Sequence, residues 1–348
     1  MSAPANIETE FLLSHGEAER AIARAFESGT LHHSILITGA KGIGKATLGY
    51  RLARYIFSKQ GGDMFEKLRL RAGEIKMKGF DEGEGAPRLA GGLAALDDSP
   101  MRIPKSAPIF SRFASGGIQD FKAVEREWAD EEKLRRRPKI TIDQVRRLRD
   151  FFSTTSAEGG HRVALVDAVD EMTTEAANAL LKILEEPPEK SYLILVAHNP
   201  ASVLPTIKSR CRIVRLGPIA PEHMDTLLEK YIPDSDAAQR ERLKSLARGS
   251  IGAAIALYEG GATKLQDSLA AAIEGRETAA FIKAAAAEFE AFKAVALDFI
   301  ESRARAAKAP EGLLDLRSEI LRIFAAVGNA NLDPGLVVFS VIDKMRRA

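Results

Sequence analysis

Residues 163–188 read VALVDAVDEMTTEAANALLKILEEPP, and this stretch decides the fold. It opens with an apolar run, Val163 to Val166, that ends in Asp167 and Ala168. A short, continuous apolar run rich in valine is typical of a strand buried on both faces of a parallel sheet. A second run, Tyr192 to Ala197, follows the helical segment and its two prolines. Buried strands joined through a helix predict an α/β domain, with a parallel sheet flanked by helices.

A glycine-rich loop follows another apolar segment near the start of the chain. Residues 34–38 read SILIT, and residues 39–47 read GAKGIGKAT before a segment with helical periodicity. Strand, glycine loop and helix in this order are typical of the phosphate-binding loop of NTPases, where backbone N–H groups and a lysine contact phosphates. The alternative is a tight turn that binds no ligand. The candidate nucleotide-binding residues are Gly39, Gly42, Gly44, Lys45, Thr47 and Asp167.

Two positions lack a side chain that ATP hydrolysis requires. The residue after the lysine normally carries a hydroxyl that ligates magnesium, but here it is Ala46, and Thr47 is rotated by about 100° around the helix. Ala168 has a methyl group at the strand end where an NTPase carries the carboxylate that activates water. We therefore expect poor magnesium binding, weak binding of ATP or ADP or none at all, and no intrinsic ATPase activity.

A family resemblance rests on the same residues. Residues 163–188, together with Ser209-Arg210-Cys211, resemble the AAA+ subunits of sliding-clamp loaders. Residues 15–48, which read HGEAERAIARAFESGTLHHSILITGAKGIGKATL, extend the resemblance through the glycine loop. It covers about residues 10–58 and 138–255 of the 348 in the chain.

The resemblance implies three domains. They are an AAA+ P-loop domain at residues 1–217 with an insertion at about 60–117, a three-helix lid at 218–261, and an all-α collar at 262–348. In hydrolysing subunits of this family the residue that matches Ala168 is glutamate, and the lid carries an arginine where this chain has Gly252. Arg210 matches the arginine finger that enters the ATP site of the adjacent subunit. The alternative for Arg210 is a surface arginine in a salt bridge.

The implied function is that of a non-hydrolysing subunit of a bacterial DNA polymerase III clamp loader. Such a subunit completes the loader ring, offers Arg210 to a neighbour's ATP and assists loading of the sliding clamp onto primed DNA. The implied partners are the ATP-hydrolysing subunits and delta in a hetero-pentamer, the clamp, and primer-template DNA. Polymerase activity would belong to the holoenzyme. Two alternatives stay open: an active AAA+ ATPase or helicase loader that uses Thr47, and a P-loop kinase for small molecules.

Composition agrees with this interpretation. The chain has 348 residues, 45% of them hydrophobic, which predicts two or three domains with buried cores. A net charge of only +2 does not indicate a protein that wraps DNA. The single cysteine, Cys211, excludes an internal disulfide and a cysteine-based zinc module, so we expect no zinc. Neither a signal pattern nor a membrane-length apolar run is present, and we expect a cytoplasmic protein.

Several local signals predict helices and loops. Ser14 with Glu17, and Thr141 with Gln144, are candidate capping boxes. Residues 221–231, 235–247 and 251–258 predict the three lid helices, and Asp333-Pro334 predicts the start of the last helix of the collar. Residues 60–117 are rich in glycine, proline and charge, which predicts a long and partly flexible insertion.

Two further groups of polar residues have a local or a functional explanation. His198 and Asn199 follow the strand at 192–197, where AAA+ proteins place a polar residue near the γ-phosphate, but we expect them to satisfy local backbone groups. A basic run forms either a solvated face or a contact with DNA phosphates. It comprises Lys133, Arg135, Arg136, Arg137, Lys139, Arg146, Arg147 and Arg149.

Overall fold

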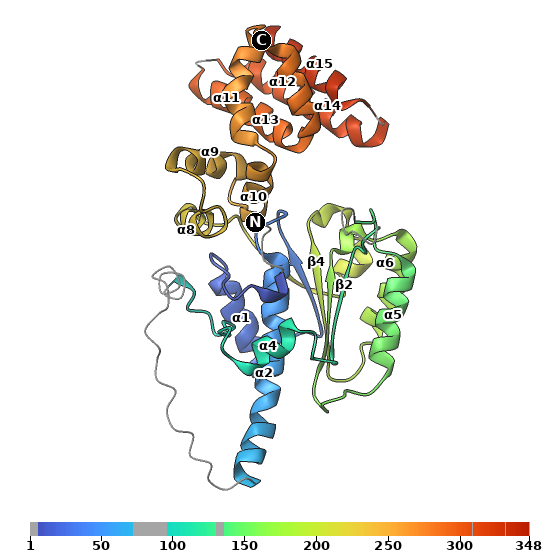
Figure 1. Cartoon of the computed structure of the whole chain (residues 1–348). Coiled ribbons are helices and arrows are strands. Elements are labelled where there is room, and N and C mark those ends of the chain that lie inside the picture. The colour runs from blue at the N-terminus through green and yellow to red at the C-terminus, as the bar shows by residue number, and fades with distance from the viewer. Residues whose placement is uncertain (1–5, 72–95, 130–135, 308, 331, 348) are drawn as a thin grey trace. The chain divides into compact units, whose positions relative to one another are not determined.

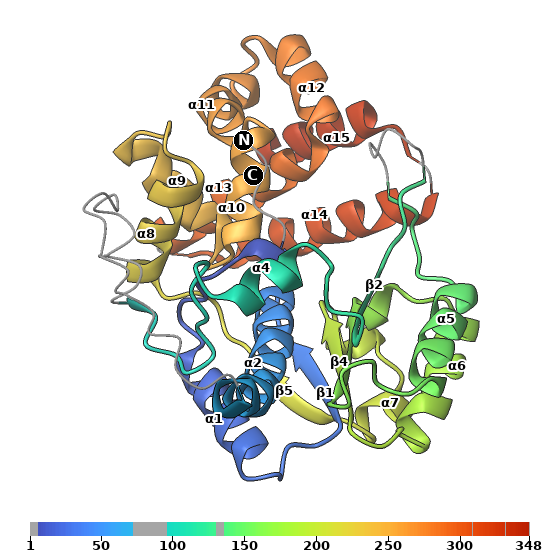
Figure 2. The same ribbon diagram turned by 60° about the horizontal axis from the view of Figure 1, so that its bottom comes forward.

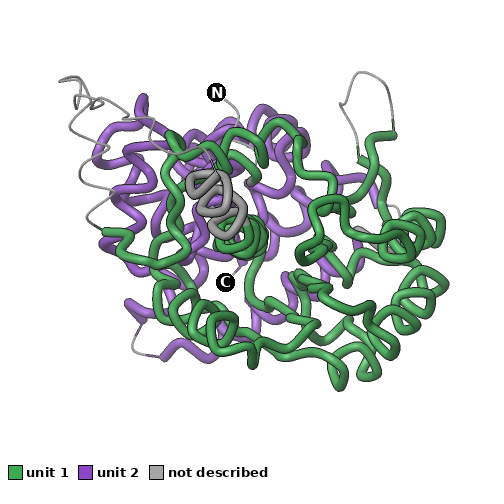
Figure 3. Tube along the Cα trace, turned by 90° about the horizontal axis from the view of Figure 1, so that it is seen from below, with its two compact units in different colours: residues 1–219 green, residues 220–348 purple. Residues whose placement is uncertain are grey.

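The computed structural model describes residues 6–71, 96–129, 136–307, 309–330 and 332–347 (Figure 1). The chain forms two compact units, residues 1–219 and residues 220–348 (Figure 3). Within the described residues, every helix is too short or too polar to cross a membrane.

A five-stranded sheet organises the first unit, and each strand is parallel to its neighbours (Figure 2). Its spatial order is β2-β3-β4-β1-β5. The predicted parallel α/β architecture is thus confirmed, while β2 and β5 were not identified from the sequence because each is short and only partly buried. The strands are β1 (Ser34–Thr38), β2 (Phe121–Glu125), β3 (Arg162–Asp167), β4 (Ser191–Ala197) and β5 (Arg212–Arg215).

Helices cover both faces of the sheet (Figure 1). On one face lie α1 (Gly16–Glu27), α2 (Lys45–Arg71) and α4 (Pro108–Ala114), and on the other lie α5 (Ile142–Ser153) and α6 (Thr174–Glu185). Side chains alternate along each strand, so the neighbouring β1 residues Ile35 and Leu36 belong to cores on opposite faces. Burial on both faces explains why the strands read as continuous apolar runs.

The two predicted capping boxes have different outcomes. Thr141 caps α5 in a complete box with Gln144, as expected. The box predicted at Ser14 and Glu17 is wrong, because α1 begins at Gly16 and its N-cap is His15. His15 is buried and its Nε2 lies 2.9 Å from the carbonyl oxygen of Ile43 in the glycine loop. The residue that precedes α1 thus contacts the glycine loop.

The last part of the insertion predicted at about 60–117, expected to be long and partly flexible, is packed into the core. Residues 72–95 lie outside the described residues, but residues 96–117 pack against α2. Met101 is fully buried, and Phe113 from α4 is almost fully buried in the same core. Asp97 is also buried, where it pairs with Arg51 of α2. Its charge therefore belongs to an interior ion pair, whereas from the sequence it counted as a sign of flexibility.

In the described residues after β5, all regular structure is helical, as predicted. The three predicted lid helices are present, and α9 begins slightly later than expected because Asp236 caps it in a box with Gln239. Asp333 caps the last helix by accepting a hydrogen bond from the backbone N of Leu336. The division of this unit at residue 261 stays a prediction. Its helices are α8 (Pro221–Tyr231), α9 (Ala237–Ala247), α10 (Ile251–Glu259), α11 (Ala262–Ile273), α12 (Thr278–Ala287), α13 (Phe289–Ala306), α14 (Glu311–Ala330) and α15 (Pro334–Arg347).

Candidate functional site

The glycine loop joins the carboxyl end of β1 to the first residue of α2, Lys45. Gly39, Gly42 and Gly44 all have positive φ angles, at 148°, 81° and 102°. A Cβ atom on Gly39 would lie 2.6 Å from the carbonyl oxygen of Leu216, and one on Gly44 would lie 2.5 Å from Cδ1 of Leu12. Other residues would therefore be strained at these two positions, and the loop has the form that the sequence predicts.

Lys45 is buried at the start of α2, with only 3% of its surface exposed. Its Nζ donates a hydrogen bond to the carbonyl oxygen of Ala40 within the same loop. Burial lowers the pKa of Lys45 to about 8, although the carboxylates of Asp167 and Asp170 oppose this shift. The lysine is therefore still mostly charged at neutral pH, and the loop itself satisfies part of its hydrogen-bonding capacity.

The first turn of α2 contains both Ala46 and Thr47, and both are buried. Ala46 occupies the position where a magnesium ligand is expected, and its methyl group cannot coordinate a cation. Within the described residues, no cluster of three or more histidine, cysteine, aspartate or glutamate side chains is arranged to hold a metal ion.

Asp167 ends β3 and lies close to the charges around Lys45. Burial raises its pKa to about 6, the Glu125 carboxylate adds to the rise, and Lys45 opposes it. Ala168 follows and is fully buried in the core beneath α2. The carboxylate of Asp167 is therefore costly to ionise, and the next position, where a water-activating carboxylate is expected in a hydrolysing NTPase, has only the methyl group of Ala168.

His198 and Asn199 continue from the end of β4 at the same edge of the sheet. Their backbone N–H groups donate to the two carboxylate oxygens of Asp170, at 2.9 and 2.8 Å. Burial and the nearby Lys45 lower the pKa of His198 to about 4, so its ring is neutral at physiological pH. Its Nε2 is 3.9 Å from Oδ1 of Asp167, which is too far for a hydrogen bond, so we treat the two as neighbours and not as an ion pair.

The side chain of Asn199 caps the short helical turn that follows, by accepting a hydrogen bond from the backbone N of Ala201. The expected local role is thus present for the side chain of Asn199, whereas His198 contributes its backbone N–H to the contact with Asp170. Sequence reasoning did not identify Asp170 as the residue that holds this edge together. Its sequence signal is a second acidic residue three positions after Asp167.

Arg210 follows the short helix α7 (Pro205–Lys208) and keeps 37% of its side chain exposed. Its Nη1 donates to the carbonyl oxygen of Thr206 at 3.1 Å, and its Nη2 lies 2.9 Å from Oε1 of Glu185. Arg210 therefore forms the surface salt bridge that one interpretation expects. It is also partly exposed, as the interpretation as an arginine finger requires. Burial raises the pKa of the thiol of its neighbour Cys211 to about 12, so this thiol is protonated at neutral pH.

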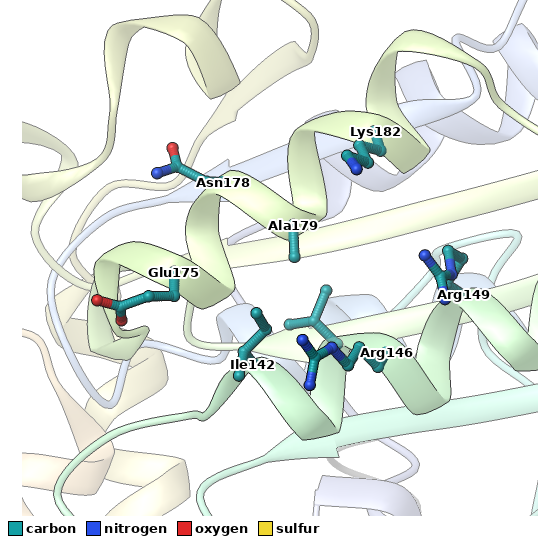
Figure 4. Close-up of a pocket in the computed structure, with 8 residues that line it drawn as sticks. Ile142, Arg146, Arg149, Glu175, Asn178, Ala179 and Lys182 are labelled. Carbon is teal, nitrogen blue, oxygen red and sulfur yellow. The ribbon is translucent and has the colours of Figure 1, made fainter.

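A groove of about 380 Å³ lies between α5 and α6 (Figure 4). Arg146 and Arg149 from α5 and Lys182 from α6 line it, with Glu175 as its acidic residue. The sequence identified the two arginines but not Lys182, because the packing of α6 on α5 brings it to the same groove. Within the basic run, Lys133 and Arg135 lie outside the described residues.

Gly252 lies in the first turn of α10, within the second unit. Ser250 caps this helix by accepting a hydrogen bond from the backbone N of Ala253 at 3.1 Å. The G-S pattern therefore begins a helix, and the position where the family resemblance expects an arginine has no side chain.

Comparison with known proteins bears on this arrangement. A family model described as "DNA polymerase III, delta subunit" matches residues 76–220. The chain is 39% identical over 139 residues to DNA polymerase III subunit delta' of Pseudomonas aeruginosa, covering 39% of this chain and 40% of that protein. It is 26% identical over 255 residues to the subunit of the same name from Escherichia coli, covering 73% of this chain and 63% of that one.

These alignments thus span less than two thirds of each relative's length. A solved structure of a DNA polymerase III gamma subunit-related protein from Thermotoga maritima aligns with 94% of this chain and 98% of its own, with a TM-score of 0.48 and 18% identity. The resemblance that the sequence motifs indicated is confirmed over the matched segments: this chain is similar to the delta' subunits of bacterial DNA polymerase III.

Proposed function

We propose that this chain is a delta prime-like, non-hydrolysing subunit of a DNA polymerase III clamp loader. It completes the loader ring, supplies Arg210 to a neighbouring ATP site and assists loading of the sliding clamp onto primed DNA. One observation carries the proposal: the chain lacks side chains for hydrolysis at Ala46 and Ala168, yet it exposes Arg210 beyond the end of α7.

The absence of hydrolysis follows from the chemistry of phosphoryl transfer. Catalysis there consists mainly of positioning and of neutralising charge on the phosphates, with magnesium and a residue that orients water. Ala46 and Ala168 remove a magnesium ligand and the water-orienting group, and Gly252 removes a cation from the lid. The glycine loop and Lys45 can still contact phosphates, but a magnesium ligand is missing. The site therefore binds ATP or ADP weakly or not at all.

Action in trans needs none of the missing groups. An arginine supplied by an adjacent subunit stabilises charge on the transferring phosphoryl group without its owner binding ATP. Such fingers contribute about 10³- to 10⁵-fold to turnover in well-studied nucleotide hydrolases. Arg210 has the necessary exposure, and its guanidinium has five N–H donors, so it can contact a phosphate in addition to its present partners.

The remaining partners follow from the second unit and from the groove between α5 and α6. Helices α8 to α10 form the lid, and α11 to α15 form the collar that joins the ATP-hydrolysing subunits and delta in a hetero-pentamer. The cations Arg146, Arg149 and Lys182 contact primer-template phosphates when the ring encloses DNA. The complex meets the sliding clamp and acts in the cytoplasm.

The test of the finger is ATP turnover by the assembled loader, with the clamp and primed DNA present. We expect Arg210→Ala to lower the maximal rate by at least about 100-fold at the site it serves, with the complex still assembled. Arg212→Ala is the matched control, because Arg212 is another exposed arginine in the adjacent strand β5. Equal turnover for Arg210→Ala and Arg212→Ala in intact complexes would refute the assignment.

A further inference from the structure

Within its own chain, Arg210 is held by Glu185, the last residue of α6. Oε1 of Glu185 lies 2.9 Å from Nη2 of Arg210, while Nη1 is held by the carbonyl oxygen of Thr206. The guanidinium is thus fixed on one side by backbone and on the other by a carboxylate. Sequence reasoning did not foresee this pair, because 25 positions separate its members.

The location of Glu185 is unfavourable for a carboxylate unless a cation lies beside it. The carboxyl end of a helix has a partial negative charge, which disfavours an acidic side chain in its last turn. The next residue, Glu186, adds a second negative charge. Arg210 is the cation with which Glu185 forms an ion pair, so it compensates this local excess of negative charge.

The same pair is exposed enough to be exchanged. The exposed fractions of the two side chains are 37% for Arg210 and 49% for Glu185. Ion pairs at such sites shift equilibria by only about 1.4- to 5-fold. A terminal phosphate group carries more negative charge than one carboxylate and accepts two parallel hydrogen bonds from a guanidinium. A nucleoside triphosphate brought close by a neighbouring subunit therefore competes effectively for Arg210.

We propose that Glu185 is an internal competitor for the arginine finger. It holds and neutralises Arg210 until the phosphate of a nucleoside triphosphate on the neighbouring subunit replaces it. This inference rests on the proposed function of Arg210. It makes Glu185 a positioning residue that sets how readily Arg210 engages, since it contacts no substrate itself.

The experiment measures ATP turnover of the assembled loader against ATP concentration and against salt. Glu185→Gln removes the charge and keeps the shape of the side chain. We expect about a 1.4- to 5-fold rise in turnover at ATP concentrations below KM, through a lower KM. The difference from wild type should shrink between about 0.05 and 0.5 M salt, because salt screens an exposed pair. A merely structural role would not produce this salt dependence.

Three further variants sharpen the result. Glu186→Gln removes the adjacent charge but leaves the ion pair of Arg210 with Glu185, so it should change turnover less than Glu185→Gln does. Glu185→Asp should lie close to wild type because it keeps the carboxylate. In the double variant Glu185→Gln with Arg210→Ala, the gain should disappear and turnover should equal that of Arg210→Ala. These results together support Glu185 as a competitor.

Lower or unchanged turnover in Glu185→Gln complexes that assemble normally would overturn the inference. If that result came with a strong loss in Arg210→Ala, the finger would stand and only the role of Glu185 would fall. If Arg210→Ala had no effect, the proposed function itself would fail.

Discussion

Asp167 is held in surroundings that do not favour its charge. Its side chain is only 16% exposed, and burial together with the Glu125 carboxylate raises its pKa to about 6. The charge of Lys45 offsets part of this rise. Burial also disfavours the charged form of Lys45 itself and lowers its pKa to about 8. At neutral pH both groups are mostly charged, so the folded chain bears a cost at the proposed nucleotide site.

We therefore expect Asp167→Asn to be more stable than wild type at pH 7.5. Between about pH 4 and 6 the folded chain keeps a proton that the unfolded chain has released, so the wild-type free energy of unfolding falls as the pH rises through this window. The rise of the Asp167 pKa to about 6 corresponds to roughly 3 kcal/mol, and the loss of a partner for Lys45 reduces the gain in stability to about 1–2 kcal/mol. Urea unfolding of both proteins at pH 4 and pH 7.5 measures this difference in the free energy of unfolding.

Asp143→Asn is the control for Asp167→Asn, since Asp143 is an exposed carboxylate, 70% accessible, in an ion pair with Arg146. It should change the free energy of unfolding by less than about 1 kcal/mol. The account would be contradicted if the Asp167→Asn variant were less stable than wild type at pH 7.5, or if the difference in their free energies of unfolding did not depend on pH. Either result would show that the carboxylate stabilises the fold.

The residues that the sequence identified lie at fixed spacings within local motifs, whereas those it missed make contacts between distant parts of the chain. The places of Ala46 and Ala168 in the fold could be predicted because each lies at a fixed distance from a glycine loop or a buried strand. The contacts of Asp170 and Glu185 could not, because each joins residues 25 or more positions apart through the packing of separate elements. Local spacing predicts what a residue is able to do, whereas tertiary packing decides its partners.

Among the elements, the segment at 96–117 shows most clearly how composition can mislead. Arg51 of α2 lies in the core with its Nε 2.6 Å from Oε1 of Glu19 in α1, and its Nη1 2.8 Å from Oδ2 of Asp97. All three side chains are at most 1% exposed. Burial raises the pKa of Glu19 in spite of the adjacent arginine. One cation thus ties two helices and the returning segment together.

Arg51→Met should lower the free energy of unfolding by about 3–5 kcal/mol. The methionine has a comparable length, but it leaves two buried carboxylates without a cation. Arg112→Met is the matched control, because Arg112 forms an ion pair with Glu158 in which both side chains are more than 40% exposed. We expect Arg112→Met to lower the free energy of unfolding by less than about 1 kcal/mol, as measured by urea unfolding. Similar losses in the two variants would contradict the importance of the buried network.

At the scale of the whole molecule, the second unit has an apolar surface that its own core does not use. The last helix, α15, buries one face, which includes Val338 and Val341, and exposes 71% of Leu336 and 53% of Phe339 on another. Leu314 and Leu321 of α14 are also exposed. Exposed large apolar side chains on two helices that pack against each other are consistent with the proposed collar, because such side chains often mark a protein interface.

The double variant Leu336→Lys with Phe339→Lys tests this surface. We expect it to fold with a free energy of unfolding within about 1 kcal/mol of wild type, because both side chains are exposed. We expect it to be lost from the complex in size-exclusion chromatography with the other loader subunits, because two charges would be buried. Leu96→Lys, at an exposed leucine of the first unit, should assemble normally. Full incorporation of the double variant would exclude this face from the interface.

The most direct test of the whole account compares ATP hydrolysis by this chain alone with hydrolysis by the assembled loader on primed DNA. We expect no turnover above background from the isolated chain, even with excess magnesium, because of Ala46 and Ala168. In the assembly we expect turnover that depends on Arg210. Magnesium-dependent hydrolysis by the chain alone, unaffected by Arg210→Ala, would contradict the account and show that this subunit is an active ATPase.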